Sequence, residues 1–251
     1  MSNEEVVVII PARYGSKRLP GKPLIPINGR PLVLCVLDRA RKIPAIDRII
    51  VGTDDDRILE VVRKEGGEAV LTPVGLLSGS DRVGWIAQNL QSRIIVNLQG
   101  DEPLFDVKSV QKGIETIIEE QDLDVVSLGF PLTSEEEWKN PDIVKVLTND
   151  SNYALYFSRC PIPYYRDGDF YPVPSLYKHI GIYIYKRSFL LKFLKWDKSP
   201  LENAEKLEQL RILYKGCNIK IIRSNSPSIG VDVSADIERV EKILKGEITI
   251  E

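Results

Sequence analysis

The feature that most constrains the fold is the regular alternation of strand-like and helix-like segments in the first hundred residues. Short runs rich in β-branched residues, typical of strands buried on both faces, alternate with longer segments of helical periodicity. Expected strands cover 6–10, 48–52, 68–71 and 93–98; expected helices cover 32–40, 55–64 (capped by Thr53-Asp54) and a segment opening at Ser80-Asp81. Repeated β-α-β units of this length predict an α/β fold with a mostly parallel central sheet flanked by helices.

The amino-acid composition changes after about residue 145. Eight of the ten tyrosines fall between Tyr153 and Tyr185, together with several prolines. We interpret the aromatic residues as packing, partly at a subunit interface, rather than as a stacking platform for single-stranded nucleic acid, because few cations are interleaved. Expected strands cover 143–147, 153–157, 180–185 and 219–222, and expected helices cover 199–216 and 235–245. The first three strands suggest a smaller mixed α/β region.

Composition excludes several classes of protein. The chain has 34 Lys+Arg against 36 Asp+Glu and a net charge of −2, so it lacks the basic excess of a duplex nucleic-acid binder. Its three cysteines are scattered, which argues against a disulfide framework or a zinc site. The first apolar run, 6–10, is too short for a signal peptide or a membrane span. We expect a cytoplasmic protein that binds neither nucleic acid nor membrane.

The strongest local signal is a cationic, glycine- and proline-rich loop between Pro11 and Leu24. It directly follows the first expected strand, at the sheet edge where α/β proteins bind ligands. Its glycines permit tight turns, and its Lys and Arg heads together with backbone N–H groups suit a triphosphate. The spacing from Gly15 to Gly21 does not fit a Walker A motif, and Pro23 stands where that motif has a magnesium-binding hydroxyl. The loop also lacks the dinucleotide-binding glycine pattern, which disfavours a dehydrogenase.

Two aspartates are candidate metal ligands. Asp101 follows the strand 93–98 through Gln99-Gly100, so its carboxylate should face the same edge as the cationic loop, and Asp232 follows a late, turn-rich segment. Magnesium prefers one or two carboxylates together with phosphates and water. If the two acids lie close together, they form with the loop a site for a metal-bound nucleotide.

Other polar residues have weaker signals. His179 is the only histidine, which excludes histidine-based metal clusters, and a lone histidine beside a strand is more often structural than catalytic. No Gly-x-Ser-x-Gly elbow is present, which disfavours a Ser-His-Asp hydrolase. Glu205, Glu208, Gln209 and Arg211 lie on the expected helix 199–216, where their pattern alone suggests a solvated charged face.

Several blocks of sequence, taken in order, match one known family. They are PARYGSKRLPGKPL (11–24), SGSDR (78–82), NLQGDEP (97–103), YALYFSR (153–159), HIGIY (179–183), SPLE (199–202), LEQLR (207–211) and GVD (230–232). The chain resembles the 3-deoxy-manno-octulosonate cytidylyltransferases, also called CMP-Kdo synthetases, over about residues 6–245. The first block is shared with other nucleotidyltransferases, whereas 99–103, 179–183 and 207–211 are more specific.

The resemblance implies a Rossmann-like nucleotidyltransferase fold, a homodimer, and transfer from CTP to the 2-keto-3-deoxy sugar acid Kdo, with Mg2+ and release of pyrophosphate, for lipopolysaccharide synthesis. It implies one domain, 1–251, with a nucleotide-binding half (1–105) and a sugar-binding and dimerisation region (140–195). Carried over, Arg13, Lys22, Asp101 and Asp232 would be catalytic, with the two aspartates binding the metal. Nucleotide contacts would come from Arg13, Arg18, Lys22, Ser78 and Arg82. Sugar contacts would come from Gln99, Arg159, Arg166, His179, Tyr183, Glu208 and Gln209.

Two departures from the family pattern bear on the sugar. Residues 74–77 are apolar where many relatives carry a polar stretch, and Val233 stands where Thr is usual. One alternative is therefore the same chemistry on 8-amino-Kdo or another sugar acid. A rival from another class is a catalytically silent nucleotide-binding module, which the presence of both aspartates and of the cationic loop disfavours.

Overall fold

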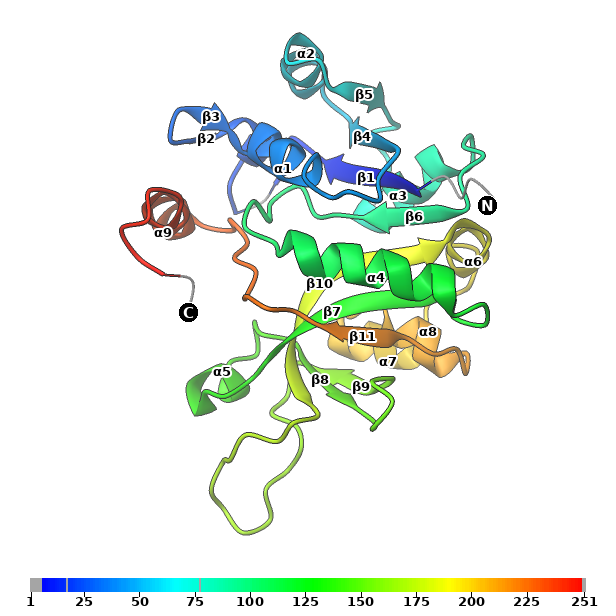
Figure 1. Ribbon diagram of the computed structural model, residues 1–251, viewed down its shortest axis with the longest axis vertical. Coiled ribbons are helices and arrows are strands. Elements are labelled where there is room, and N and C mark those ends of the chain that lie inside the picture. Colours follow the sequence, from blue (N-terminus) through cyan, green and yellow to red (C-terminus); the bar gives the residue numbers. More distant parts are fainter. Residues whose placement is uncertain (1–5, 17, 77, 250–251) are drawn as a thin grey trace.

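The computed structural model describes residues 6–16, 18–76 and 78–249. In this part of the chain, one nine-stranded sheet runs through the molecule, with helices on both faces (Figure 1). Its main path is β11-β7-β10-β6-β1-β4-β5, and β8 and β9 extend it from β10. The bounds along that path are Lys220–Arg223, Val125–Pro131, Leu176–Lys186, Ile94–Asn97, Val6–Ala12, Arg48–Thr53 and Glu68–Leu71. All pairings on it are parallel except those of β10, which is antiparallel to β6 and β7. The mostly parallel α/β sheet expected from the sequence is thus confirmed.

The alternating side chains of β1 show why helices cover both faces of the sheet. Val6, Val8 and Ile10 enter one core with helices α1, α2 and α4. Val7 and Ile9 enter a second core with α3, α6 and α8. Burial of one Val or Ile side chain stabilises a fold by roughly 1.5–3 kcal/mol, so this strand anchors both layers. The helices are α1 Leu32–Ala40, α2 Asp56–Lys64, α3 Gly79–Ala87, α4 Val107–Glu119, α6 Arg187–Phe193 and α8 Leu210–Tyr214.

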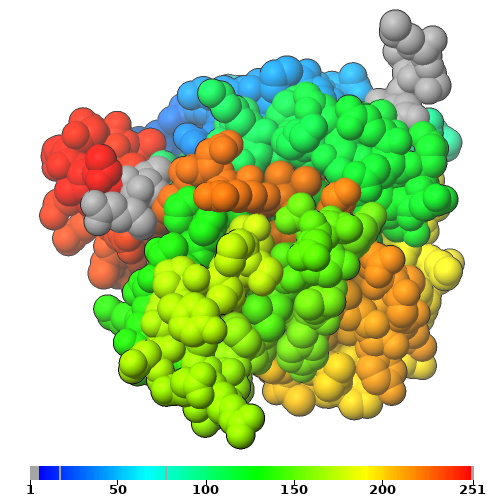
Figure 2. Space-filling view, turned by 60° about the horizontal axis from the view of Figure 1, so that its bottom comes forward, coloured from blue at the N-terminus to red at the C-terminus, as the bar shows by residue number. Residues whose placement is uncertain are grey.

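Strands β8 (Lys145–Thr148) and β9 (Ala154–Ser158) form an antiparallel extension at the start of β10. The segment 159–175 then projects beyond the rest of the molecule (Figure 1) and occupies much of the lower front in the space-filling view (Figure 2). Its inner side is held by a ring cluster in which Tyr165 lies 5.3 Å from Trp138 and 5.6 Å from Phe170, measured between ring centroids. Its outer side leaves the Tyr164 side chain 87% exposed.

Smaller elements complete the described chain. A 3-10 turn (Lys22–Leu24) and the hairpin of β2 (Pro26–Ile27) and β3 (Arg30–Pro31) precede α1; α5 is Glu135–Lys139, α7 is Pro200–Glu205 and α9 is Ser234–Leu244. No described helix combines the length and the apolar character needed to cross a membrane.

Three local expectations differ from the structure. The predicted helix 199–216 is two helices, α7 and α8, because Lys206 takes a left-handed conformation (φ 55°) that ends the first. Helix α2 is capped by Asp55 rather than by Thr53-Asp54, since the Asp55 carboxylate accepts from the Arg57 N–H. No element was predicted for residues 104–142, where the structure has α4, β7 and α5.

Candidate active site

The cationic loop and the Asp101 turn meet at one edge of the sheet. Strands β1 and β6 are parallel neighbours, so the segments that follow them leave at the same carboxyl edge. A cavity of about 590 Å3 lies there. It is lined by 11–13, Ser16, Arg18, Lys22, Pro23, Ser78, Gly79, Arg82, 99–101 and Asp232. Every residue expected to contact nucleotide or metal therefore lines one cavity.

Tyr14 gives the cationic loop its shape. Its carbonyl accepts hydrogen bonds from Ser16 N (2.9 Å) and Gly21 N (3.0 Å), which fold the loop back on itself. Gly21 has φ +71°, and a Cβ there would lie 3.2 Å from the Tyr14 ring, so both the backbone and the space favour glycine. The Arg57 guanidinium carbon lies 3.6 Å from the centre of the same ring. These contacts hold the described residues of the loop together, with the exposed Arg13 and Arg18 at the cavity.

Lys22 joins the two aspartates. Its Nζ donates to Asp101 Oδ2 and lies 3.1 Å from Asp232 Oδ1, and Arg18 Nη2 lies 2.9 Å from the same Asp232 oxygen. Burial alone lowers the pKa of Lys22, but the charge and hydrogen bond of Asp101, reinforced by Asp232, outweigh it and raise the pKa. Lys22 is therefore held as an ammonium between two carboxylates that are far apart in sequence.

The segment that carries Asp232 is tied to the Asp101 turn. Val231 N donates to the Asp101 carbonyl at 2.8 Å, and Ser228 Oγ donates to Glu102 Oε2 at 2.6 Å. Burial of the Glu102 carboxyl, together with the nearby charges of Asp101 and Asp232, raises its pKa to about 7 despite the Ser228 hydrogen bond. Main-chain and side-chain contacts thus fix the two aspartates relative to one another.

The donor set fits a divalent ion bound together with a nucleotide. Within the described chain no group of three or more His, Cys, Asp or Glu is placed to hold a metal. Asp101 and Asp232 provide two carboxylates already close enough to share one cation, Lys22. A hard ion such as Mg2+ binds in this way when phosphates and water complete its shell.

Asp54 links the loop to the far side of the cavity. Its two carboxylate oxygens accept from Tyr14 N at 3.1 Å and from Arg82 Nη2 at 3.0 Å. Arg82 is only 2% exposed and also donates to the Thr72 hydroxyl. Ser78 caps α3 through a reciprocal capping box with Asp81, which sets the edge of the cavity.

Four of the residues expected to contact sugar lie in or beside the elements that border this cavity. Gln99 lines the cavity, and its amide donates to the Gly181 carbonyl of β10 at 3.1 Å. On the same strand, the rings of His179 and Tyr183 lie 5.4 Å apart. Burial raises the pKa of Glu208 against the opposing effect of its hydrogen bond to Ser80 on α3. Of these four residues only Gln99 lines the cavity, whereas His179 and Tyr183 lie on the strand that Gln99 contacts and Glu208 contacts α3.

The break between α7 and α8 lets side chains of the two helices contact each other. Glu202 and Arg211 form a buried bidentate pair with two N–O distances of 2.7 Å, and Gln209 is only 6% exposed. The charged face suggested by helical periodicity is thus partly buried, and that expectation is wrong for Gln209 and Arg211.

The two arginines expected at the sugar carboxylate are placed differently. Arg159 Nε donates to the Glu205 carbonyl at 2.9 Å, and its Nη1 donates to the Pro141 carbonyl at 3.1 Å. Arg166 is exposed on the projecting segment and has no hydrogen bond or ion pair to another residue that the structure describes. Neither arginine lines the cavity, so their contact with sugar stays a prediction.

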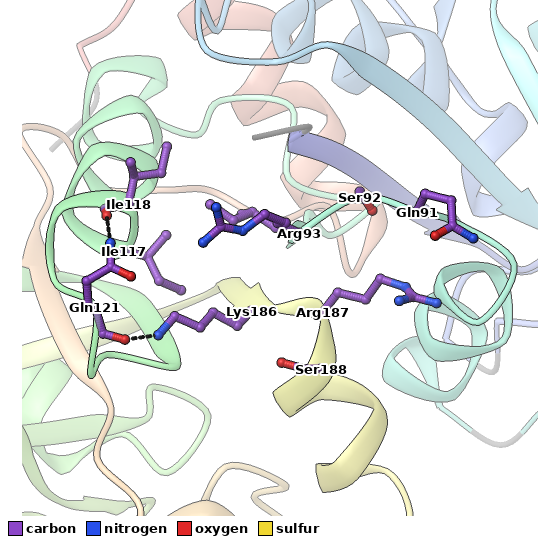
Figure 3. Close-up of a pocket in the computed structure, with 10 residues that line it drawn as sticks. Gln91, Ser92, Arg93, Ile117, Ile118, Gln121, Lys186, Arg187 and Ser188 are labelled. Atoms are coloured by element: carbon purple, nitrogen blue, oxygen red, sulfur yellow. Dashed lines mark hydrogen bonds between the residues drawn. The ribbon is translucent and has the colours of Figure 1, made fainter. Parts of the chain in front are cut away.

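A second cavity, of about 340 Å3, lies at the opposite end of β6, near the junction of β10 and α6 (Figure 3). Two of its basic side chains donate hydrogen bonds to main-chain carbonyls and so stabilise the fold. Arg187 donates to the carbonyls of Ala87 (2.7 Å) and Gln88 (3.0 Å), and Lys186 donates to that of Gln121. The first cavity is therefore the candidate active site.

The sequence did not single out Tyr14, Asp54, Glu102 or Ser228. Asp54 had a usable signal, because it follows a parallel strand at the same edge as Asp101. The contact between Glu102 and Ser228 had no signal in the sequence, since the two residues are 126 positions apart.

The chain is similar to known cytidylyltransferases. Residues 7–222 match the cytidylyltransferase family. The 3-deoxy-manno-octulosonate cytidylyltransferases of Syntrophotalea carbinolica and Acinetobacter baumannii are 40% and 41% identical, over 96% and 94% of this chain and 99% and 96% of theirs. The solved structure of a CMP:2-keto-3-deoxy-manno-octonic acid synthetase complexed with CTP has a TM-score of 0.91 at 38% identity, covering 97% of this chain and all of that one. The chain therefore belongs to the 3-deoxy-manno-octulosonate cytidylyltransferase family of nucleotidyltransferases.

Proposed function

We propose that this enzyme transfers the cytidylyl group of CTP to Kdo, giving CMP-Kdo and pyrophosphate. The observation that carries the proposal is the ammonium of Lys22 between Asp101 and Asp232, beside the cationic loop and in one cavity. Its support is the likeness to the CTP complex of a CMP:2-keto-3-deoxy-manno-octonic acid synthetase. We place this reaction in the cytoplasm, in lipopolysaccharide synthesis.

The reaction is an in-line displacement at phosphorus. The anomeric hydroxyl oxygen of the sugar bonds to the α-phosphorus, and its proton passes to water. The bond between the α-phosphorus and the bridging oxygen breaks, and pyrophosphate leaves with that electron pair. Arg13, Arg18 and Lys22 hold the triphosphate and offset the charge that develops on the leaving group. Mg2+ held by Asp101 and Asp232 would supply Lewis-acid polarisation and lower the pKa of the hydroxyl. Ser78 and Arg82 contact the cytidine.

The sugar acid binds beside the nucleotide, across Gln99 and β10. Gln99, His179, Tyr183, Glu208 and Gln209 contact its hydroxyls. Arg159 or Arg166 pairs with its carboxylate, for which a guanidinium fork is the best partner. Residues 1–105 thereby act as the nucleotide-binding half and 140–195 as the sugar-binding region.

The same region serves as a homodimer interface in this proposal. Three large apolar or aromatic side chains of this region, those of Tyr164, Tyr171 and Leu155, are 87%, 61% and 61% exposed, and subunit contacts commonly cover such groups. Sedimentation equilibrium of the purified chain tests it, with Tyr164→Ser expected to shift the mass from dimer toward monomer.

The decisive test is pyrophosphate release from each of the four nucleoside triphosphates with Kdo, 8-amino-Kdo or sialic acid. We expect release with CTP and Kdo. Pyrophosphate release with 8-amino-Kdo alone would show that 8-amino-Kdo, rather than Kdo, is the substrate. Measurable CTP binding without release for any sugar would identify a silent binding module instead.

A further inference from the structure

Strand β10 is irregular where it passes the active site. Its register against β7 shifts between Ile180 and Tyr183, which marks a bulge. Bulges are common beside active sites because they redirect side chains and remove carbonyls from the ladder. Here the carbonyls of Ile180 and Ile182 approach one hydroxyl, Ser127 Oγ, at 3.3 and 2.9 Å.

The same hydroxyl contacts the only histidine. Ser127 lies on β7 with no exposed surface, and its Oγ is 2.9 Å from His179 Nε2. A serine hydroxyl has a single proton to donate and can accept as well. Two carbonyls compete for that proton, and a hydroxyl turned toward the histidine would leave both carbonyls facing its lone pairs. The proton therefore goes to a carbonyl, and Nε2–H of His179 must donate to Ser127.

We propose that Ser127 is a positioning residue of the sugar site, which holds His179 as the Nε2–H tautomer and leaves Nδ1 as an acceptor for a sugar hydroxyl. Neighbouring rings fix the imidazole, with Phe157 edge-on at 5.0 Å and Tyr183 at 5.4 Å. No described residue forms a hydrogen bond with Nδ1. Burial lowers the pKa of His179 to about 3, so the ring is neutral at physiological pH, and its hydrogen bond to Ser127 selects the tautomer.

The role assigned to Nδ1 rests on the proposed function. A neutral ring with a free acceptor can bind a hydroxyl donor but not a carboxylate. His179 therefore selects for a hydroxyl at its position on the sugar acid, and the carboxylate must be held by a cation elsewhere.

The tautomer is directly measurable because the chain has one histidine. Long-range 1H–15N correlation spectra of the untagged, 15N-histidine-labelled full chain at neutral pH should show one neutral imidazole protonated at Nε2. Ser127→Thr, which keeps the hydroxyl, should preserve that pattern, whereas Ser127→Ala should give an exchanging mixture. A wild-type spectrum protonated at Nδ1 would overturn the proposal even if the variants failed to fold, and so would an unchanged spectrum for Ser127→Ala.

Steady-state kinetics test the functional half. Ser127→Ala should raise the KM for Kdo about three- to tenfold, the loss of roughly one hydrogen bond, with the KM for CTP unchanged and Ser127→Thr near wild type. Ser92→Ala is the matched control, because Ser92 is a buried serine at the far end of β6 whose hydroxyl has no hydrogen-bond partner within the described chain. A changed tautomer with an unchanged KM for Kdo would refute the role in sugar binding. A wild-type enzyme inactive with Kdo would instead refute the proposed function and leave the spectra to decide the tautomer.

Discussion

At the scale of single residues, the site is organised by charge. Lys22 is the contact common to the cationic loop, the β6 turn and the segment before α9, through Asp101 and Asp232. Two like charges placed close together repel, so their approach requires a cation between them. The same arrangement prepares the carboxylates for a divalent ion when nucleotide binds.

The carboxylate of Asp101 should be essential to turnover. Asp101→Asn keeps the size of the side chain but removes the charge that binds the metal, so we expect pyrophosphate release to fall by about a hundredfold or more. Asp122→Asn is the matched control, since Asp122 is exposed after α4. Near-wild-type turnover of Asp101→Asn would exclude it as a ligand.

His179 should make stability depend on pH in the acid range. Its pKa is about 3 in the folded chain, whereas an exposed histidine has a pKa of about 6.5. Between these values the unfolded chain binds more protons, so the free energy of unfolding falls as pH drops through this window, by up to about 1.4 kcal/mol per pH unit. Urea unfolding at pH 5 and 7.5 should show a steeper pH dependence for wild type than for His179→Gln. Equal dependences would contradict neutral burial.

At the scale of elements, the turn after β6 is the most constrained feature. A Cβ on Gly100 would lie 2.7 Å from the Pro11 carbonyl oxygen, and backbone cannot yield as a side chain can. Strands β1 and β6 approach closely here, so the glycine lets the Asp101 turn pack directly against the start of the cationic loop.

Gly100→Ala should therefore displace Asp101. We expect a loss of roughly 1–3 kcal/mol in the free energy of unfolding, typical of overpacking, together with a fall in turnover. The control is Gly75→Ala, because a Cβ at Gly75 meets nothing within 4 Å. Calorimetry and pyrophosphate release would measure both, and equal behaviour of the two variants would argue against a close approach at this turn.

Regular helices and strands were the most predictable part of the structure. Continuous β-branched runs identified β1, β4 and β6, because fully buried parallel strands need such runs. The sequence did not reveal the break at Lys206, since nothing in the local pattern requires a left-handed residue there. Lys145 is similar. It has no exposed surface and donates to the carbonyls of Asn140, Ile143 and Arg159, a tertiary arrangement that a strand pattern conceals.

At the scale of the whole molecule, the site depends on segments far apart in sequence that meet at one sheet edge. The rule that ligands bind beyond the carboxyl ends of parallel strands located the cationic loop and Asp101 in advance. Asp232 follows no parallel strand directly, so the local pattern alone was weak evidence for it, and the family resemblance was what assigned it as a metal ligand beside Asp101. Its place depends on α9, whose Glu241 accepts from Asn28 N in the β2–β3 turn at 2.7 Å.

The most direct measurement is Mn2+ binding in the presence of CTP, followed by electron paramagnetic resonance in wild type and in Asp232→Asn. If the late carboxylate completes a metal–nucleotide site with Asp101 and Lys22, wild type binds Mn2+ with CTP and the variant binds it about tenfold or more weakly. The same Mn2+ affinity in both proteins would contradict that arrangement.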